Sequence, residues 1–246
     1  MLINMLKKII FPKTYSSEAY VEYLRESGCK IGDNCIIWSP NNTTIDATRP
    51  GLLEIGNNVK ITQGVTILCH DYSRSVMRLR FGENIGEARK TIIGNNVFIG
   101  VNSVILMGTR LGNNTIVGAG AIVSGTFPDD VIIAGNPARV ICNLEDYYEK
   151  RKVRSIEEAK QYANGFYELN NRYPTIEEMG NAFSWQYLPR EPESLEKYSA
   201  FFNLKGDDHK DIIECFMKSS PYYDSYDMFI AQCIKDRKSS LGIKHE

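Results

Sequence analysis

The amino-acid sequence predicts a mainly β protein: a parallel β-helix with a short N-terminal helix and a C-terminal α-helical extension. Three observations predict this fold class. Residues 93–128 divide into six blocks of six, IGNNVF, IGVNSV, ILMGTR, LGNNTI, VGAGAI and VSGTFP, and an aliphatic residue opens every block. A period of six fits neither an amphipathic helix nor an alternating strand, but it is typical of a solenoid of hexapeptide repeats. After about residue 142 the apolar spacing becomes helical.

The period of six follows from the geometry of a coil with three flat faces, in which three hexads make one turn. The opening aliphatic side chain points inward and stacks on its equivalents in the coils above and below, which buries a continuous apolar column. Glycine and asparagine suit the corners, where a positive φ or crowding excludes other residues. Short antiparallel hairpins are the alternative, but they would alternate with period two.

The N-terminal segment, residues 1–29, is predicted to contain one helix over residues 16–27. A serine at 16 or 17 can cap it, and Gly28 can end it. The first ten residues are apolar with two lysines. We expect them to pack on their own protein, and the alternative is a weak contact with a membrane surface.

Residues 30–142 are predicted to form the β-helix, with about four to five coils. The period slips over residues 38–53, where two prolines and a polar cluster predict an irregular coil. It breaks again after His70. Residues 71–91 have no hexad pattern and carry five basic residues, so we expect a loop that leaves the solenoid and returns at Ile93.

The phrase VIIAGNPARVI at 131–141 is expected to close the stack, because an open last coil would expose its core and its strand edges. Residues 143–246 are predicted to be a helical extension. Capping-box patterns at Ser155 and Thr175 predict two helix starts, and apolar residues around 212–216 and 226–234 predict two further helices.

Composition narrows the function classes. The formal net charge of the 246 residues is −1, so no global field favours nucleic acid. The six cysteines form no CxxC pair and have no histidine at metal spacing, so we expect mostly buried thiols in a reducing compartment and no metal. We find no transmembrane segment, since no apolar run is long enough to span a bilayer, and we expect a cytoplasmic protein.

Three runs carry a family resemblance: IGNNVKITQGVTILCHDY, IGNNVFIG and IVGAGAIVSGTFPDDVIIAGNPARVI. They resemble the hexapeptide-repeat acyltransferases, above all the sugar O-acetyltransferases: the galactoside and maltose enzymes and those of capsule or O-antigen synthesis. The resemblance implies a left-handed β-helix, a homotrimer with active sites between subunits, and acetyl-CoA as the donor.

His70 is the candidate catalytic residue, since it is the one histidine within the repeat. Acetyl transfer from a thioester to a hydroxyl needs a base with a pKa near neutrality, which an imidazole supplies. The residue also ends a coil where a loop departs, as in the family. A surface histidine without a role is the alternative. Cys69 is adjacent, but neighbours on a strand point to opposite faces, so we expect direct attack in a ternary complex rather than an acyl-enzyme.

The resemblance also implies binding residues. Asn42 and Asp46 match the region that contacts the acceptor sugar in galactoside acetyltransferases. Asn41 competes with Asn42, and the alternative for each is a polar corner of the solenoid. The candidates for contacts with the donor are Phe98, Val101, Gly118, Ala119, Ser124 and Arg139. A guanidinium such as that of Arg139 suits phosphate oxygens. The family often has Thr-Lys where this chain has Ser124-Gly125, so phosphate binding is expected to rest more on Arg139.

We therefore expect an acetyl-CoA-dependent O-acetyltransferase that acts on a sugar hydroxyl during surface-polysaccharide assembly. N-acetylation of an amino sugar or of an antibiotic is the alternative, because its chemistry at His70 would be the same. A non-catalytic scaffold belongs to another class, and His70 argues against it. The basic residues of 71–91 have two interpretations of equal weight, namely contact with an anionic acceptor or solvation. A zinc site is disfavoured, since three ligands would be needed.

Overall fold

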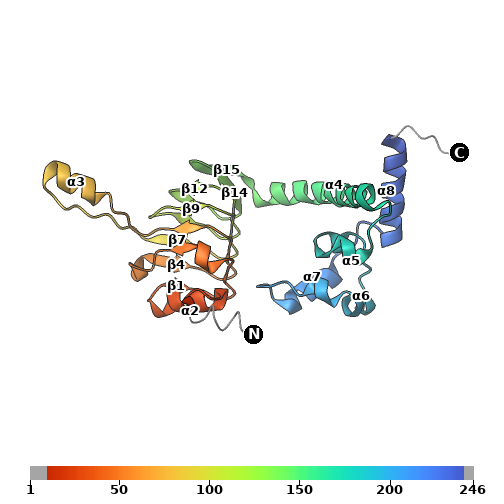
Figure 1. Ribbon diagram of the computed structural model, residues 1–246, viewed down its shortest axis with the longest axis horizontal. Coiled ribbons are helices and arrows are strands. Elements are labelled where there is room, and N and C mark those ends of the chain that lie inside the picture. Colours follow the sequence, from red (N-terminus) through yellow and green to blue (C-terminus); the bar gives the residue numbers. More distant parts are fainter. Residues whose placement is uncertain (1–9, 241–246) are drawn as a thin grey trace. The chain divides into compact units, whose positions relative to one another are not determined.

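A computed structural model of the chain describes residues 10–240. The chain consists of two compact units, Met1–Tyr147 and Tyr148–Glu246. The first unit contains the strands and the second contains most of the helices (Figure 1). The first nine residues lie outside the described part, so neither interpretation of the N-terminal ten residues is tested.

The first unit is a parallel β-helix whose coils visit three sheets in turn (Figure 1). The five-stranded sheet contains β1 (Lys30–Ile31), β4 (Leu53–Ile55), β7 (Thr91–Ile93), β10 (Arg110–Leu111) and β13 (Thr126–Phe127). The six-stranded sheet contains β2 (Ile36–Ile37), β5 (Lys60–Ile61), β8 (Phe98–Ile99), β11 (Ile116–Val117), β14 (Val131–Gly135) and β15 (Ala138–Asn143). The four-stranded sheet contains β3 (Thr44–Ile45), β6 (Thr66–Ile67), β9 (Val104–Ile105) and β12 (Ile122–Val123).

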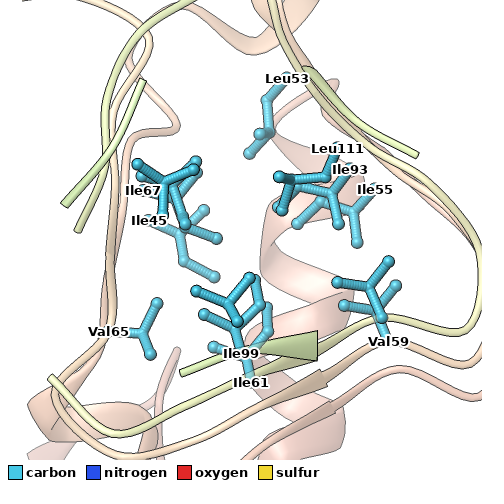
Figure 2. Packing of buried hydrophobic residues seen from close by; sticks show 14 of the residues in the cluster. Ile45, Leu53, Ile55, Val59, Ile61, Val65, Ile67, Ile93, Ile99 and Leu111 are labelled. Carbon is cyan, nitrogen blue, oxygen red and sulfur yellow. The ribbon is translucent and has the colours of Figure 1, made fainter. Parts of the chain in front are cut away.

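The aliphatic residues that open the hexads point inward, as predicted. Six of them are at most 3 % exposed: Ile93, Ile99, Ile105, Leu111, Val117 and Val123. Figure 2 shows the resulting columns, in which Ile55, Ile93 and Leu111 stack along one face and Ile61 and Ile99 along another. Each such side chain contributes roughly 1.5–3 kcal/mol through burial, so the stack is the main source of stability in this unit.

Asparagines form the corners, also as predicted. Asn96 and Asn114 have φ of 54° and 53°, a left-handed conformation that asparagine tolerates better than most residues. The Nδ2 of Asn96 donates to Asn114 Oδ1 at 2.8 Å, and the Nδ2 of Asn114 donates to Asp130 Oδ1 at 2.8 Å. The corner residues of successive coils are thus hydrogen-bonded to one another.

Both ends of the stack are covered. Helix α2 (Ser17–Glu26) begins after Ser16, whose hydroxyl accepts from the Ala19 amide at 3.1 Å, and it buries Tyr20, Val21 and Leu24. The Tyr20 hydroxyl accepts from the Ile45 amide at 3.1 Å, which ties the helix to a strand of the first coil. At the other end β15 turns back antiparallel to β14. The phrase at 131–141 therefore closes the solenoid, as expected.

The excursion at 71–91 contains a helix that the sequence did not lead us to expect. Helix α3 (Arg74–Phe81) stands at the end of an arm that projects from the coils (Figure 1) and buries none of its residues. Val76, Leu79 and Phe81 are 69 %, 84 % and 70 % exposed. The missing hexad period predicts a loop, but a solenoid can also interrupt its period with a helix.

The second unit packs its helices around an aromatic core. It contains most of α4 (Leu144–Asn170), then α5 (Ile176–Met179), η3 (Asn181–Gln186), α6 (Pro192–Lys197), η4 (Ser199–Phe202), α7 (His209–Lys218) and α8 (Tyr226–Ser240). Its buried residues include Ala159, Ala163, Tyr187, Phe202, Phe216 and Phe229. No helix of the described chain is long and apolar enough to cross a membrane.

One of the four helix predictions needs correction. The predicted start at Thr175 is confirmed, since its capping box is present and begins α5, which is 4 residues long. The helix start at Ser155 is wrong, because α4 runs through that residue without a break. The Ser155 backbone oxygen and hydroxyl instead accept from Gln186 Nε2 at 2.9 and 2.8 Å. Helices α7 and α8 lie where two further helices were expected.

Candidate active site

His70 lies at a corner of the solenoid, where the chain leaves the four-stranded sheet for the arm. Strand β6 ends at Ile67, and the Leu68 amide still donates to Ile105 of the next coil at 2.9 Å. The returning arm then pairs with the departing one, since His70 forms an antiparallel bridge with Ala88. The His70 side chain is 31 % exposed, so its ring is held on one side and open on the other.

Asp46 holds the His70 ring. The Nδ1 of His70 lies 2.5 Å from Asp46 Oδ2, which also accepts from the Cys69 amide at 3.1 Å. Asp46 Oδ1 accepts from the amide of Thr48 at 3.0 Å and from its hydroxyl at 2.6 Å. The pair forms because Asp46 and Leu68 follow the paired strands β3 and β6, so neighbouring coils bring residues 46 and 70 to one corner.

The environment keeps Asp46 ionised at neutral pH. Burial alone would raise the pKa of this carboxyl, and the side chain is only 5 % exposed. The hydrogen bonds from Thr48, His70 and the Cys69 amide outweigh burial and lower the pKa to about 2. An ionised carboxylate can only accept, so His70 must donate from Nδ1. In neutral His70, Nε2 is then the free acceptor, and it has no hydrogen bond within the described residues.

This geometry changes the interpretation of Asp46. Its place in the sequence predicts contact with the acceptor, but all four of its hydrogen bonds are made within the protein and its side chain is buried. Thr48 was missed. Its signal is the spacing D-x-T, in which an aspartate binds the amide and hydroxyl two residues ahead in a local turn.

Asn42 and Asn41 differ in what their side chains contact. Both are exposed and belong to η1 (Pro40–Asn42), the turn before β3. The Oδ1 of Asn41 accepts from the Thr14 hydroxyl, whereas Asn42 uses only its backbone amide, which donates to Ser39 O at 2.8 Å. The side chain of Asn42 is therefore the one free to meet a ligand.

Cys69 faces the interior, on the other side of the strand from His70. It is 0 % exposed, and its Sγ donates to the Leu52 carbonyl at 3.3 Å. Burial raises the pKa of the Cys69 thiol, although a hydrogen bond with Thr91 opposes that effect. A buried, protonated thiol is a poor nucleophile.

Four of the candidate donor-binding residues gather at a different corner. Phe98 and Val101 are 40 % and 43 % exposed, and Ala119 is also exposed. The Gly120 amide donates to Val101 O at 2.8 Å, which joins the two coils there. A Cβ on Gly100 would lie 2.6 Å from the Ala119 amide nitrogen, so only glycine allows this approach. Gly118 precedes Ala119 in this turn, and the four residues Phe98, Val101, Gly118 and Ala119 are called the ledge below.

The remaining two candidates lie apart from that ledge. Arg139 is exposed on β15, where its Nη1 donates to the carbonyl of Ala138 at 2.7 Å and its remaining N–H groups are available. Ser124 directly follows β12 and is exposed. The register of the four-stranded sheet places Ser124 in the column of Asp46, several coils along.

One chain therefore brings His70, Asp46 and Thr48 together, but it does not bring the ledge to them. The ledge lies where the coils pass from the six-stranded to the four-stranded sheet, and His70 lies where they leave the four-stranded sheet. No group of three histidine, cysteine, aspartate or glutamate side chains gathers as a metal site within residues 10–240.

The described chain thus combines a parallel stack of hexads with a histidine–aspartate pair at one of its corners. The model of the family described as hexapeptide repeat of succinyl-transferase matches residues 90–124. Protein CapG of Staphylococcus aureus is 38 % identical over 143 residues, which are 58 % of this chain and 82 % of CapG. The chain belongs to the hexapeptide-repeat acetyltransferase family, and it is an acetyltransferase.

Two further proteins are similar to this chain. Galactoside O-acetyltransferase of Lactococcus lactis is 27 % identical, over 58 % of this chain and 76 % of that protein. The solved structure of a galactoside acetyltransferase in complex with coenzyme A is 23 % identical, covers 60 % of this chain and 82 % of that one, and superposes with a TM-score of 0.37.

Proposed function

We propose that the protein transfers an acetyl group from acetyl-CoA to a sugar hydroxyl, with His70 as the general base. The observation that carries the proposal is the 2.5 Å contact between His70 Nδ1 and the buried Asp46 carboxylate. It orients the ring and leaves Nε2 as a proton acceptor on a side chain that is 31 % exposed. A base placed in this way typically contributes on the order of 10²–10⁴-fold to the rate.

The reaction follows from this geometry by direct attack. The acceptor hydroxyl gives its proton to Nε2 as its oxygen attacks the thioester carbonyl, and the Asp46 carboxylate stabilises the imidazolium that forms. When the tetrahedral intermediate collapses, the carbon–sulfur bond breaks and the leaving thiolate takes the proton back from Nε2. Asp46 is then a positioning residue, and Thr48 in turn fixes Asp46. The inward-facing Cys69 takes no part.

The exposed apolar residues of the ledge support a role in binding the pantetheine arm of the donor. The exposed apolar side chains of Phe98 and Val101 offer contact surface, and Gly118 and Ala119 keep the wall low. We propose that this arm lies along the ledge, that Arg139 binds phosphate oxygens of the donor, and that Ser124 adds a hydroxyl contact.

We propose that the active site is completed in a homotrimer of left-handed β-helices. The separation of His70 from the ledge within one chain supports this, since a neighbouring copy can supply the ledge that faces His70. The arm supports it too. Val76, Leu79 and Phe81 expose apolar surface that a second copy would cover.

For the acceptor, we propose a carbohydrate of a surface polysaccharide under assembly in the cytoplasm, with Asn42 as a contact. The likeness to a galactoside O-acetyltransferase supports the sugar. We further propose that residues 30–142 form the catalytic domain, that α2 of the N-terminal segment 1–29 caps it, and that 143–246 form an extension with a separate role.

The test is CoA release from acetyl-CoA with a panel of neutral, acidic and amino sugars. His70→Asn should lower turnover by at least 10²-fold at unchanged thermal stability. His209→Asn is the matched control, because the one hydrogen bond of this exposed α7 side chain within residues 10–240 is to the Phe202 carbonyl, and the exchange should leave turnover unchanged. Near-normal turnover of His70→Asn would refute the assignment, and activity confined to amino sugars would favour N-acetylation.

A further inference from the structure

The helical unit contains a pocket that the acetyl-transfer chemistry does not use. It has a volume of about 450 Å³. It lies between η3, the turn after α7 and the first residues of α4 that belong to the helical unit. Ligand pockets commonly measure roughly 300–1,000 Å³. The residues of its lining that matter here are Tyr148, Lys152, Trp185, Gln186, Arg190 and Tyr222.

Arg190 brings an unneutralised positive charge to this pocket. Its guanidinium donates to the Trp185 carbonyl at 2.5 Å, to Ser219 Oγ at 2.9 Å and to the Leu188 carbonyl. These contacts use three of its five N–H groups, and no carboxylate of the described residues forms an ion pair with it. Burial lowers the pKa of Arg190, as expected for a charge that lacks a counter-ion. A bound anion would supply that counter-ion.

The side-chain oxygen of Gln186 is a hydrogen-bond acceptor to which no group donates in the described part of the chain. Its Nε2 donates to the backbone oxygen of Ser155 at 2.9 Å, which fixes which end of the amide is nitrogen. Its Oε1 is buried and has no hydrogen-bond partner among the described residues. A buried oxygen left in this state costs free energy, and a ligand hydroxyl recovers it when the Gln186 side chain turns Oε1 toward the pocket.

Aromatic rings and a second cation complete the lining. Tyr148 and Tyr222 are 57 % and 64 % exposed, the Nζ of Lys152 lies over the Tyr148 ring at 5.1 Å from its centroid, and Trp185 also belongs to the lining. The Nζ of Lys152 lies 3.3 Å from Glu149 Oε1, so Glu149 neutralises the positive charge of Lys152. The positive charge of Arg190 remains in excess. The pocket therefore combines flat amphipathic surfaces, one cation in excess and an acceptor for a hydroxyl.

We propose that this pocket binds a carboxylate-bearing sugar residue of a glycan chain. The free N–H groups of Arg190 take the carboxylate, Gln186 Oε1 accepts a ring hydroxyl, and the aromatic faces contact the C–H surface of the ring. The inference rests on the proposed function in one respect, because it makes the acceptor an acidic glycan. If this pocket binds one sugar residue of such a glycan, the effective concentration of the glycan's other sugar residues near the protein rises.

The test is calorimetric titration of the full chain with three probes: a tetrameric oligogalacturonate, a neutral maltotetraose and inorganic phosphate. We expect the acidic oligosaccharide to bind at least tenfold more tightly than either control. Lys152→Glu and Arg190→Gln should each weaken it by about tenfold or more. Lys150→Glu is the matched control, since this exposed residue of α4 makes the same charge change outside the lining and should keep the affinity.

Arg190 also bonds to backbone carbonyls, so Arg190→Gln needs a thermal unfolding check, and Tyr222→Ala, on an exposed ring, serves as a second variant. Equal binding of phosphate and oligogalacturonate, or affinity unchanged in Lys152→Glu and Tyr222→Ala, would overturn the proposal. His70→Asn should bind the glycan normally. Binding without any acetyl transfer by the wild type would thus contradict the proposed function alone, and acetyl transfer without binding would contradict this pocket alone.

Discussion

The exchange Asp46→Asn removes one buried negative charge and keeps the size of the side chain. The hydrogen bonds of the site lower the pKa of Asp46 from 3.8 to about 2. At 1.36 kcal/mol per pKa unit, this shift corresponds to about 2 kcal/mol that favours the carboxylate over the neutral group. An asparagine cannot supply that interaction. Its amide can instead donate to Nδ1, which would place the imidazole proton on Nε2 and remove the base.

We therefore expect Asp46→Asn to lower kcat by about 10²–10⁴-fold with little change in the KM of the acceptor, since the base would be present in the wrong tautomer. Steady-state CoA release over pH 5–9 measures both quantities. Asp71→Asn is the matched control. It removes the same charge one residue after His70, but its carboxylate binds Ser73 rather than the ring.

Three outcomes would refute this reasoning. If Asp46→Asn kept kcat within threefold of the wild type, the carboxylate would not orient the base. If KM rose while kcat stayed constant, Asp46 would contact the acceptor, as its place in the sequence first suggested. An equal loss in Asp71→Asn would mean that local charge, rather than the hydrogen bond to Nδ1, determines the rate.

The remaining predictions concern stability and the nucleophile. Since the folded-state pKa of Asp46 is lowered to about 2, its stabilisation is complete above pH 4 and is lost as the pH falls through 2; urea midpoints should drop over this window less steeply in Asp46→Asn than in the wild type. Ile99→Ala, at a residue that is 0 % exposed, should cost about 2–5 kcal/mol in urea unfolding, and an equal loss in Phe98→Ala, on the exposed side of β8, would argue against the inward column. Cys69→Ala should keep turnover within threefold, whereas a burst of acetyl-enzyme that this variant abolishes would establish a covalent route.

The coils could be predicted because each hexad satisfies a local rule. An aliphatic residue every sixth position has one arrangement in which all such residues are buried, and the asparagines at the corners tolerate the left-handed conformation that the corners need. The helix α3 was missed for the converse reason. Its eight residues interrupt the period, and an interruption indicates only that the chain leaves the stack.

The error at Ser155 has a different cause. The pattern S-x-x-E describes a capping box only where the chain enters the helix from outside, and the same letters inside a helix lack the free amides that a cap satisfies. The continuous helix α4 gives Ser155 another partner, Gln186, which is 31 residues away and could not be inferred from spacing.

The order of residues is enough to predict the parallel stack, its inward columns and the position of His70 where the stack is interrupted. The role of Asp46 in holding that histidine emerges only from the folded chain. The two residues are 24 apart in the chain, and Asp46 itself belongs to the irregular coil, so their meeting depends on the register of β3 against β6. A repeat in the sequence indicates which position each residue occupies within its own coil. Which residues of neighbouring coils meet depends on how many residues each turn of the solenoid contains. That number is a property of the folded chain.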